Sequence, residues 1–559
     1  MKKIAKLLCL VLVVVMAVGI LAACSSDKKS GTTDKDSTST TGTSGSSSSG
    51  SSSGSSSSTG DKAATEEEVD YAAKVDTYTL LAPLFGELPD LKDEVLYQMI
   101  REQFGINWDI TWVSSSDYTT KFQTVLSSGD IPDVVVATSL LNSTLNQCIA
   151  DGYFADLTDY LGDFSKYPNM LNNSTEGAWN YVKTADGTRI VGIPRNRAAL
   201  EMVIYMRKDW MDKFGYKVED IKTVWDWKDA IVKIAKGDPD GNGKDDTVGF
   251  AAFGYTLGDG YITDNMASAF GAYNGQKDED GGLYYYELTD GWIDYIQFAH
   301  EMYKDGAVSK EFSVLSLSEA NDMFTAGLAV SYCRTGTWAW GYEDNLKNNL
   351  GIADAEVIAL PALKGTNGNT TAVQTTGVYG AYFLNSELSE YDLLKLLNFY
   401  EKTNVEEWHN YAFFGMEDRD YVIAADGSKE TTQYGKDNIM RYQSLQQVIM
   451  TMANTELKLY STGAPKEFND KIKAAALTYL EPDANIRINH FRAINSESWA
   501  TVWPKYKSKY EENTVKAIVG EMSIDEYRDY IHNLRSQPDM KQCWQEFAKH
   551  DALLFPDGY

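Results

Sequence analysis

The body of the chain alternates between short apolar runs and longer segments with apolar residues at helical spacing. Residues 78–82 and 110–113 have the composition of strands, and residues 91–104 and 117–126 repeat their apolar positions with the period of a helix. Residues 132–137 form an almost wholly apolar run, which is typical of a strand covered on both faces. This alternation predicts an α/β architecture in which helices are layered on a mostly parallel sheet.

A second α/β segment begins with the strand-like residues 202–206 and continues with a predicted helix over 225–236. Further helices are predicted over residues 291–304, 317–326, 390–401, 439–451 and 465–480. Two such segments in a chain of 559 residues indicate two lobes. Ligands favour the cleft between lobes, so the site is expected there.

The first 23 residues have the order of a secretory signal peptide: lysines, then the apolar residues 7–21, then small residues. The ending Leu21-Ala22-Ala23-Cys24 resembles the lipobox of bacterial lipoproteins. The resemblance implies cleavage before Cys24 and lipid attached to its thiol. A retained transmembrane anchor is the alternative, but the apolar run is shorter than the roughly 20 residues that a span requires.

Residues 24–70 are expected to be a flexible tether, because Ser, Thr and Gly dominate as far as residue 60. Such a composition buries too little apolar surface to offset the entropy lost on ordering. A lipid at one end and a tether behind it predict a body held just outside the cell membrane. No other long apolar run follows.

The charge of the chain excludes some classes of partner. The formal net charge is −29, and removal of residues 1–23, with three lysines and no acid, makes it −32. Nucleic-acid binding and docking on anionic lipid both need clustered basic residues, so neither is expected. Beyond Cys24, the mature chain keeps Cys148, Cys333 and Cys543, an odd number at wide spacing that predicts no disulfide framework.

Several stretches resemble the extracellular solute-binding proteins of carbohydrate ABC transporters, the family that includes the maltose-binding protein. They are 128–135 (SGDIPDVV), 205–210 (YMRKDW), 324–330 (FTAGLAV), 336–340 (GTWAW) and 360–365 (LPALKG). They occur in the order that the family has. The sequence departs from the family where Val330 replaces a usual Met and where residues 415–418 (GMED) replace a commoner G-x-E-G.

The resemblance implies an α/β, two-lobed fold of the periplasmic-binding-protein type II class, with lobes that are discontinuous in sequence. The expected N-terminal lobe comprises residues 75–197 and 374–435, and the expected C-terminal lobe comprises 198–373 and 436–559. Hinge segments are expected near 195–200, near 371–376 and in the mid-430s. Closure around the ligand would be a hinge motion.

A sugar-binding site needs aromatic plates for the ring faces and planar polar groups for the hydroxyls. By the resemblance, Trp338 in the GTWAW stretch aligns with a stacking tryptophan, and Trp499 resembles a second one. Trp340 is expected in the core. Arg334 precedes Trp338 and is a candidate for binding hydroxyls or a uronate, with a salt-bridge partner as the alternative.

Two further candidates line the expected cleft. Ser139 follows the strand that ends at residue 137, and carboxyl ends of parallel strands commonly line ligand sites. Tyr379 lies where the returning strand passes the expected hinge.

Residues 238–246 (DPDGNGKDD) follow the pattern of a calcium loop. Asp238, Asp240, Asn242 and Asp246 occupy positions 1, 3, 5 and 9, and Lys244 would offer its backbone carbonyl at position 7. Position 12 is Gly249, so the bidentate Glu of an EF-hand is absent. Similar loops occur in alginate-binding and related lipoprotein members of the family. The resemblance implies a structural Ca²⁺ away from the sugar, and an acidic turn without metal is the alternative.

No H-E-x-x-H, Walker A or G-x-G-x-x-G motif is present, and no enzyme is expected. The predicted function is that of a monomeric, lipid-anchored protein on the extracellular side of the cell membrane. It captures an oligosaccharide between its lobes and delivers it to an ABC permease. The alternatives are a surface polysaccharide hydrolase or lyase, and the same binding fold with a peptide or another polar nutrient as cargo.

Overall fold

The first lobe is built on a five-stranded sheet in the order β2-β1-β3-β10-β4. The computed structural model describes residues 69–555 except 86–87, 89, 92–93, 140–141, 176, 199, 201, 259, 376, 455–458, 485–486, 490, 492–493 and 495. The predicted signal peptide, Cys24 and all but the last two residues of the tether lie outside this part. The strands of the sheet are β1 (Asp76–Leu84), β2 (Ile106–Ser114), β3 (Val134–Ala137), β4 (Ile193–Asn196) and β10 (Val378–Leu384).

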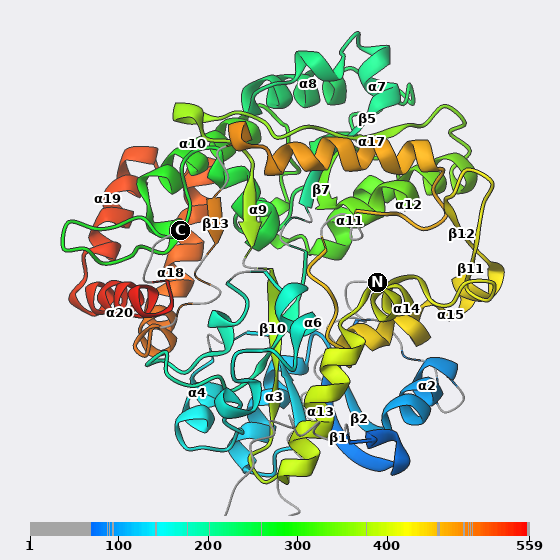
Figure 1. Cartoon of the computed structure of the whole chain (residues 1–559). Coiled ribbons are helices and arrows are strands. Elements are labelled where there is room, and N and C mark those ends of the chain that lie inside the picture. Colours follow the sequence, from blue (N-terminus) through cyan, green and yellow to red (C-terminus); the bar gives the residue numbers. More distant parts are fainter. Residues whose placement is uncertain are drawn as a thin grey trace, which may run out of the picture. The chain divides into compact units, whose positions relative to one another are not determined.

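The strands β2, β1 and β3 are parallel, and β10 runs antiparallel to both β3 and β4. All four residues of β3 are fully buried, as expected for a strand covered on both faces. Figure 1 shows this sheet in the lower part of the ribbon, with helices packed around it. The helices and helical turns of the first lobe are η1 (Tyr71–Ala73), α2 (Val95–Phe104), α3 (Tyr118–Ser128), α4 (Ser143–Ala150), α5 (Thr158–Leu161), α6 (Pro168–Asn172), η2 (Asn180–Val182), α13 (Glu390–Thr403), α14 (Glu406–Phe414), α15 (Gln433–Gln443) and η9 (Ser444–Gln447).

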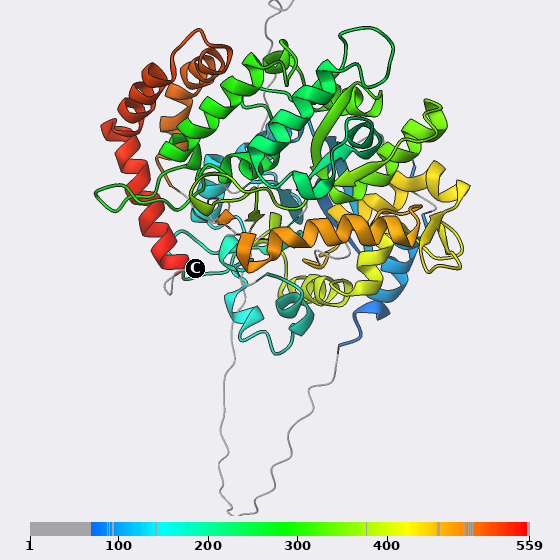
Figure 2. The same cartoon turned by 90° about the horizontal axis from the view of Figure 1, so that it is seen from above.

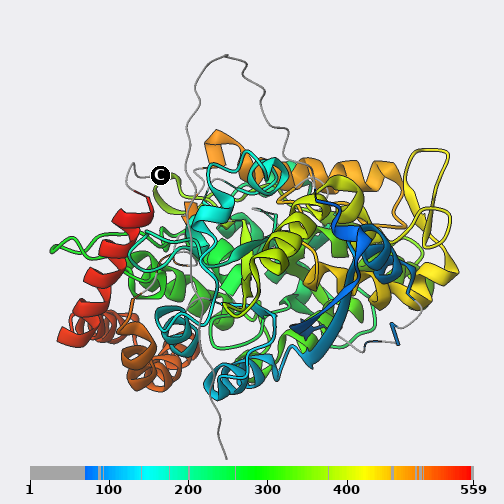
Figure 3. The ribbon, with the colours of Figure 1, turned by 60° about the horizontal axis from the view of Figure 1, so that its bottom comes forward.

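The helices of this lobe present one apolar face to the sheet. In α2, the buried residues are Leu96, Ile100 and Phe104, one turn apart each time, which is the spacing of a single helical face. A hairpin of β11 (Tyr421–Ile423) and β12 (Lys429–Thr431) connects α14 to α15. In Figure 3 the yellow segment that carries α14 and α15 lies beside the blue β1–β2 pair.

The second lobe is built on a four-stranded mixed sheet in the order β6-β7-β5-β8. Its strand β5 is antiparallel to β7 and β8, while β6 and β7 are parallel. Parallel pairing in these two sheets is therefore limited to β1, β2 and β3 in the first and to β6 and β7 in the second, so both sheets are mixed rather than mostly parallel. The antiparallel strands β5 and β10 are those that the chain enters from the other lobe. The strands are β5 (Met202–Arg207), β6 (Val248–Phe250), β7 (Ala329–Thr335) and β8 (Val357–Ala359), with a separate pair β9 (Val373–Thr375) and β13 (Arg487–Asn489).

Long helices cover the second sheet, and Figure 2 shows the last of them, in orange to red, along one edge of the ribbon. The longer helices are α7 (Lys208–Lys213), α8 (Val224–Lys236), α9 (Gly260–Ser268), α10 (Asp290–Lys304), α11 (Leu317–Thr325), α12 (Ala339–Asp344), α17 (Lys466–Leu477), α18 (Trp499–Val519), α19 (Ile524–Arg535) and α20 (Pro538–Leu554). Short helical turns are η3 (Val218–Asp220), η4 (Tyr286–Leu288), η5 (Phe312–Val314), η6 (Gly336–Trp338), η7 (Asn345–Asn349), η8 (Thr366–Gly368), η10 (Thr478–Leu480) and η11 (Pro482–Ala484).

Two hydrophobic cores define the lobes, and the chain passes between them three times. Ile193 belongs to the first core and Leu200 to the second, and the return lies between Ala372 and Val378, close to the expected hinges. The third passage differs from the expectation of a boundary at residue 435. Met450 still packs in the first core, so residues 436–450 belong to the first lobe.

The reason for this correction is the way in which α15 begins. The Thr432 hydroxyl caps the helix by accepting a hydrogen bond from Gly435 N, and it donates to Arg419 O, which ties the helix to the preceding loop. Helical periodicity predicts that such a segment is a helix but does not tell which core its apolar side faces. The helix predicted over 439–451 also begins earlier and ends at Gln443, where η9 follows.

The other predicted strands and helices agree with the structure to within a few residues. Among the described residues, no helix combines the length and the apolarity needed to cross a bilayer. Cys148, Cys333 and Cys543 are buried free thiols.

Candidate functional site

A cavity of about 240 Å³ lies in the first lobe beside two of the passages between lobes. Its wall is made by the ends of β1 and β4, the start of β10, the helices α14 and α15, and residues from 444 to 454. Among the described residues, the wall contains Arg195, Arg197 and His409, several amide side chains, and no Asp or Glu. The cavity is therefore lined by cations and neutral polar groups in a strongly acidic chain.

Tyr379 enters this cavity because of a β-bulge in β10. Val378 pairs with Asn196 and Gly380 pairs with Arg195, so Tyr379 is the extra residue between two paired ones. A bulge re-aims the side chain that it leaves unpaired. Gly380 is required next to it, because a Cβ there would lie 2.1 Å from the carbonyl oxygen of Ala137.

Two guanidinium groups lie close to the Tyr379 ring. The Cζ atoms of Arg195 and Arg197 are 4.9 and 4.7 Å from the ring centroid, and the Phe85 ring is 6.5 Å away at 54°. Such distances give cation–π attraction. The cavity thus contains an aromatic plate with two arginines close to it.

Arg195 is only 6% exposed and is held by few groups. Its Nε donates to Gln446 O at 3.1 Å, whereas its Nη1 is buried and has no hydrogen-bond partner. Burial raises the pKa of the neighbouring Tyr382 to about 12, and the nearby charge of Arg195 acts in the opposite direction. The guanidinium is therefore buried next to Tyr382 and incompletely hydrogen-bonded.

Two amide side chains in the same wall each have an oxygen without a hydrogen-bond partner. Asn196 donates through Nδ2 to Ser174 Oγ at 3.0 Å, and its Oδ1 is buried with no hydrogen-bond partner. Gln447 Oε1 is in the same state. Buried polar atoms are nearly always satisfied, so a donor and two acceptors left open in one cavity indicate a ligand with polar groups of both kinds.

In the second lobe, Trp338 forms an exposed plate. Its side chain is 48% exposed, its ring stacks on Tyr342 with centroids 6.2 Å apart, and Arg334 lies 5.4 Å from its centroid. Ser461, just past the third passage, donates to Thr337 O at 2.9 Å, so the plate borders a segment that joins the lobes. Arg334 Nε is buried without a hydrogen-bond partner.

Trp499 lies at a second cavity of about 570 Å³, lined by α4 and residues 181–189 on one side and by residues 496–500 on the other. It is 9% exposed and stacks on Trp503 with centroids 5.0 Å apart and a 7° interplanar angle. His550 also lines this cavity, and burial lowers its pKa to about 4. Most of the Trp499 ring is thus in aromatic packing, with an edge at the cavity.

Two further predicted residues lie elsewhere. Ser139 is exposed two residues beyond β3 and lines neither cavity. Trp340 was expected in the core, but it is only half-buried and packs its ring edge-on against Phe468 of α17 at 5.1 Å.

The loop of residues 238–246 follows α8 and turns through residues with positive φ at Asp238, Gly241 and Gly243. Asn242 Nδ2 donates to Asp240 Oδ2 at 2.7 Å and to Asp246 Oδ1 at 3.2 Å, so a partial positive charge lies between two carboxylates. Asp238 Oδ1 is buried with no hydrogen-bond partner. These oxygens fit a hard cation.

No group of three or more His, Cys, Asp or Glu side chains in the described part of the chain is arranged to hold a metal ion. Asp238, Asp240 and Asp246 of this loop do not form such a group either. Cys24, the predicted lipid attachment point, lies outside the described residues.

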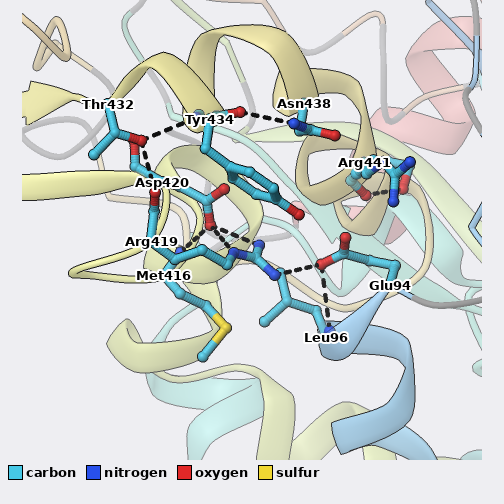
Figure 4. A network of polar contacts seen from close by, with 11 residues as sticks. Glu94, Leu96, Met416, Arg419, Asp420, Thr432, Tyr434, Asn438 and Arg441 are labelled. Carbon is cyan, nitrogen blue, oxygen red and sulfur yellow. Dashed lines mark hydrogen bonds and ion pairs between the residues drawn. The ribbon is translucent and has the colours of Figure 1, made fainter.

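A buried ion network fixes the loop that carries the unusual residues 415–418. Figure 4 shows the Arg419 guanidinium between two carboxylates, Asp420 on one side and Glu94 on the other. Arg419 Nη2 is 2.6 Å from Asp420 Oδ2, and its Nη1 is 3.1 Å from Glu94 Oε1. Met416 N donates to the same Asp420 oxygen at 2.7 Å. The network joins the start of α2 to the loop before α15, whose far end forms part of the cavity wall.

Sequence reasoning did not single out Arg195, Asn196 or Gln447. Arg195 and Asn196 lie inside a predicted hinge segment, and this position was the one feature of the sequence that could have pointed to them. Nothing in the sequence shows that their polar atoms lack hydrogen-bond partners. Tyr379 was singled out from its place at the hinge, and the bulge that turns it into the cavity has no sequence signature.

A family model described as "Bacterial extracellular solute-binding protein" matches residues 89–399. Among curated proteins, the lipoprotein LipO of Bacillus subtilis is 27% identical over 394 residues, which are 68% of this chain and 74% of LipO. The polygalacturonan/rhamnogalacturonan-binding protein YtcQ of the same organism is 23% identical over 497 residues, 88% of this chain and 94% of YtcQ.

Solved structures of the Streptococcus pneumoniae ABC-transporter substrate-binding protein FusA share the fold. The complex with kestose has a TM-score of 0.59 at 18% identity and covers 85% of this chain and 100% of that one. An EF-hand mutant in complex with fructo-nystose has a TM-score of 0.56 at 16% identity, with 85% and 99% covered. The predicted α/β, two-lobed fold is confirmed by this similarity.

Proposed function

This chain belongs to the bacterial extracellular solute-binding proteins, and from that membership we propose that it captures an oligosaccharide between its lobes and delivers it to an ABC permease. The family identity agrees with the resemblance seen in the sequence. The names of the relatives support a carbohydrate as cargo, because YtcQ and FusA are named for saccharides. Binding proteins of this kind perform no covalent step, and none is proposed.

The observation that carries the proposal is the chemistry of the cavity beside Tyr379. A sugar ring offers C–H faces to an aromatic plate and hydroxyls to planar donors and acceptors. The cavity supplies the plate together with one open donor on Arg195 and open acceptors on Asn196 and Gln447. Trp338 adds a second exposed plate in the other lobe, beside a passage between the lobes.

The mechanism is a shift in conformational population. Ligand that contacts both lobes favours the closed arrangement by the difference between its affinities for the closed and open states. The passages between the lobes are short segments that border the cavity, so rotation about them changes the distance between the plates of the two lobes. The closed form would then dock on the permease.

The proposed location is the extracellular face of the cell membrane. Residues 1–23 would be removed as a signal peptide, Cys24 would carry lipid, and the Ser- and Gly-rich residues to 70 would hold a monomeric body away from the bilayer. The lipoprotein name of LipO supports the anchor.

The loop after α8 is proposed to hold a structural Ca²⁺. Asp238, Asp240, Asn242 and Asp246 would supply side-chain oxygens and Lys244 its carbonyl. The open, buried Asp238 Oδ1 supports this assignment, as does the EF-hand named in a FusA structure. Bound Ca²⁺ would neutralise the carboxylates and fix the loop, which also accepts a hydrogen bond from Lys213 Nζ at Pro239 O.

A calorimetric titration of the protein against a panel of oligosaccharides tests the function. We expect binding of at least one oligosaccharide without release of shorter products, as followed by chromatography of the mixture. Turnover would favour the hydrolase or lyase alternative. Binding of peptides but of no oligosaccharide would show that the ligand is a peptide and would contradict the proposal of a carbohydrate.

The variant Trp338→Ala tests the second plate. Loss of one stacking face should weaken capture by roughly 3- to 10-fold, because an aromatic contact contributes about 0.5–1.5 kcal/mol. The half-exposed ring should leave the melting temperature almost unchanged. Trp225→Ala, a partly exposed tryptophan on α8, is the matched control and should not affect affinity. Unchanged affinity of the Trp338 variant would remove this residue from the site.

A further inference from the structure

The charge state of the cavity narrows the class of sugar. Arg195 forms no ion pair with any carboxylate of the described residues, although it is 94% buried. Its contacts are the Gln446 carbonyl, the Tyr379 ring and the neighbouring Tyr382. All of these are neutral groups, so the guanidinium keeps an uncompensated positive charge.

This state is exceptional within the chain. Four cationic side chains are buried in the part that the structure describes: Arg195, Arg207, Lys228 and Lys395. Arg207 pairs with Asp209 at 2.5 Å, Lys228 with Asp305 at 2.8 Å, and Lys395 with Asp76 at 2.9 Å. The fold thus supplies a carboxylate to every buried cation except the one in the cavity.

The imbalance has an energetic consequence. Burying a charge costs several kcal/mol unless it is paired, and arginine cannot lose its proton at accessible pH. Attraction to the Tyr379 ring and one carbonyl hydrogen bond offset only part of this cost. Arg197 also lies near this ring, with its Cζ 4.7 Å from the centroid.

The described lining of the cavity offers Arg195 no carboxylate. It contains two arginines, a histidine and no acidic residue, whereas the whole chain has 80 acidic and 51 basic residues. We propose that the cavity binds the carboxylate of an acidic oligosaccharide, a chain containing uronate residues, with Arg195 as its charge partner.

This inference rests on the proposed function and deepens it. A carboxylate matches the planar fork of a guanidinium and would satisfy the open Nη1, while sugar hydroxyls would satisfy Asn196 and Gln447. The names of the relatives do not tell whether the oligosaccharide is acidic or neutral, because they include both a polygalacturonan and a fructooligosaccharide. The argument for an acidic oligosaccharide comes from the unpaired Arg195.

The test is calorimetry of the mature chain with trimers of galacturonate and of mannuronate, and with the carboxyl-reduced neutral form of each. We expect at least one acidic trimer to bind more than 10-fold tighter than its neutral form. Its affinity should decrease with added NaCl, because part of the attraction is between charges. A sulfated galactose trimer and an acidic peptide complete the panel.

Variants locate the effect. Arg195→Met should weaken the acidic trimer roughly 10- to 100-fold, the usual range for a charged hydrogen bond, and leave the neutral trimer nearly unchanged. Arg195→Lys keeps the positive charge but not the planar guanidinium group, and its affinity for the acidic trimer should decrease less than that of Arg195→Met. Arg528→Met removes the same charge from an exposed ion pair on α19 and is the matched control. Melting temperatures establish that each variant is folded.

The outcomes separate the two proposals. If neutral trimers bind as tightly as acidic ones, or if Arg195→Met affects both equally, the inference is overturned and the proposed function stands. Preference for the sulfated trimer would assign the cavity to sulfate esters and also overturn it. If no saccharide binds while the acidic peptide does, the proposed function itself fails.

Discussion

Two arginines of the first lobe are in opposite electrostatic states. Arg419 lies between Asp420 and Glu94, which are 0% and 1% exposed, and both carboxylates accept from its guanidinium (Figure 4). Arg195 lies in a cavity wall whose described residues include no carboxylate. The first arrangement closes a network within the fold, whereas the second leaves a charge without a carboxylate partner beside a cavity.

The difference between the two arginines shows how a buried charge that stabilises the fold can be told from one that is available to bind a ligand. A buried ion pair is satisfied by the protein itself, so its loss should damage the fold. A buried charge without a partner destabilises the fold, so its loss should weaken ligand binding without weakening the fold. A carboxyl group has a third option, because it can neutralise itself by taking up a proton.

Glu287 illustrates this third option. It is buried in the second lobe, accepts from Tyr286 Oη at 3.1 Å, and has no cationic partner among the described residues. Burial raises its pKa to about 7, and the nearby charge of Asp264 acts in the same direction. Arginine has no equivalent response, which is why the open charge of Arg195 points to an anion from outside.

The largest expected effect is that of Arg419→Met. Removing the cation leaves two buried carboxylates unpaired, so the free energy of unfolding should decrease by about 3–5 kcal/mol. Urea denaturation followed by circular dichroism measures it. Arg419→Lys, which keeps the charge, should lose less. A decrease below about 1 kcal/mol would show that this network is not structural and would break the comparison.

Glu287 should make stability depend on pH with a defined sign. Its pKa is about 7 in the folded chain and near 4.5 unfolded, so the folded state binds the extra proton between these values. The stabilisation is complete below pH 4.5 and is lost as pH rises through 7, by roughly 3 kcal/mol. Denaturation of Glu287→Gln at pH 5 and pH 8 should lack this part of the pH dependence. An identical slope in both proteins would contradict the assignment.

The loop of residues 238–246 is the opposite case to Arg195. Its carboxylates form no ion pair with a lysine or arginine of the described residues. Chelation of Ca²⁺ should lower the melting temperature by roughly 2–5 °C, the scale expected for a site well above its dissociation constant. The double variant Asp240→Asn, Asp246→Asn should melt at the chelated temperature with or without Ca²⁺. Equal melting curves of the wild-type protein in both conditions would favour a metal-free acidic turn.

Arg195→Met should cause no loss of stability, the smallest loss of the series. No carboxylate of the described residues pairs with Arg195, so the variant leaves no buried acid unpaired, and removal of the buried charge should keep or increase the free energy of unfolding. The same denaturation experiment as for Arg419→Met provides a direct contrast. A loss of 3 kcal/mol or more would mean that Arg195 braces β4 against η9 rather than waiting for a ligand.

The sequence predicts those features that depend on neighbouring residues. The strands β1, β2, β3 and β5 and the helix α8 follow from local periodicity, and the family motifs placed them in a two-lobed fold. The boundary near residue 435 was misplaced because periodicity does not tell which core a helix joins. The sequence singled out Tyr379 from its place near the expected hinge and Trp338 from the family resemblance. It did not show that Arg195 is buried without a carboxylate partner.

What the sequence by itself determined is the alternation of strands and helices, the expected signal and tether, and the contiguous calcium-type loop. Only the tertiary structure decided which charges are paired. Arg419 meets Glu94 across 325 residues, and Lys395 meets Asp76 across 319. Pairing over such separations is set by how the sheets and helices pack. That Arg195, alone among the buried arginines and lysines of the described residues, has no carboxylate partner therefore becomes visible only in the folded chain.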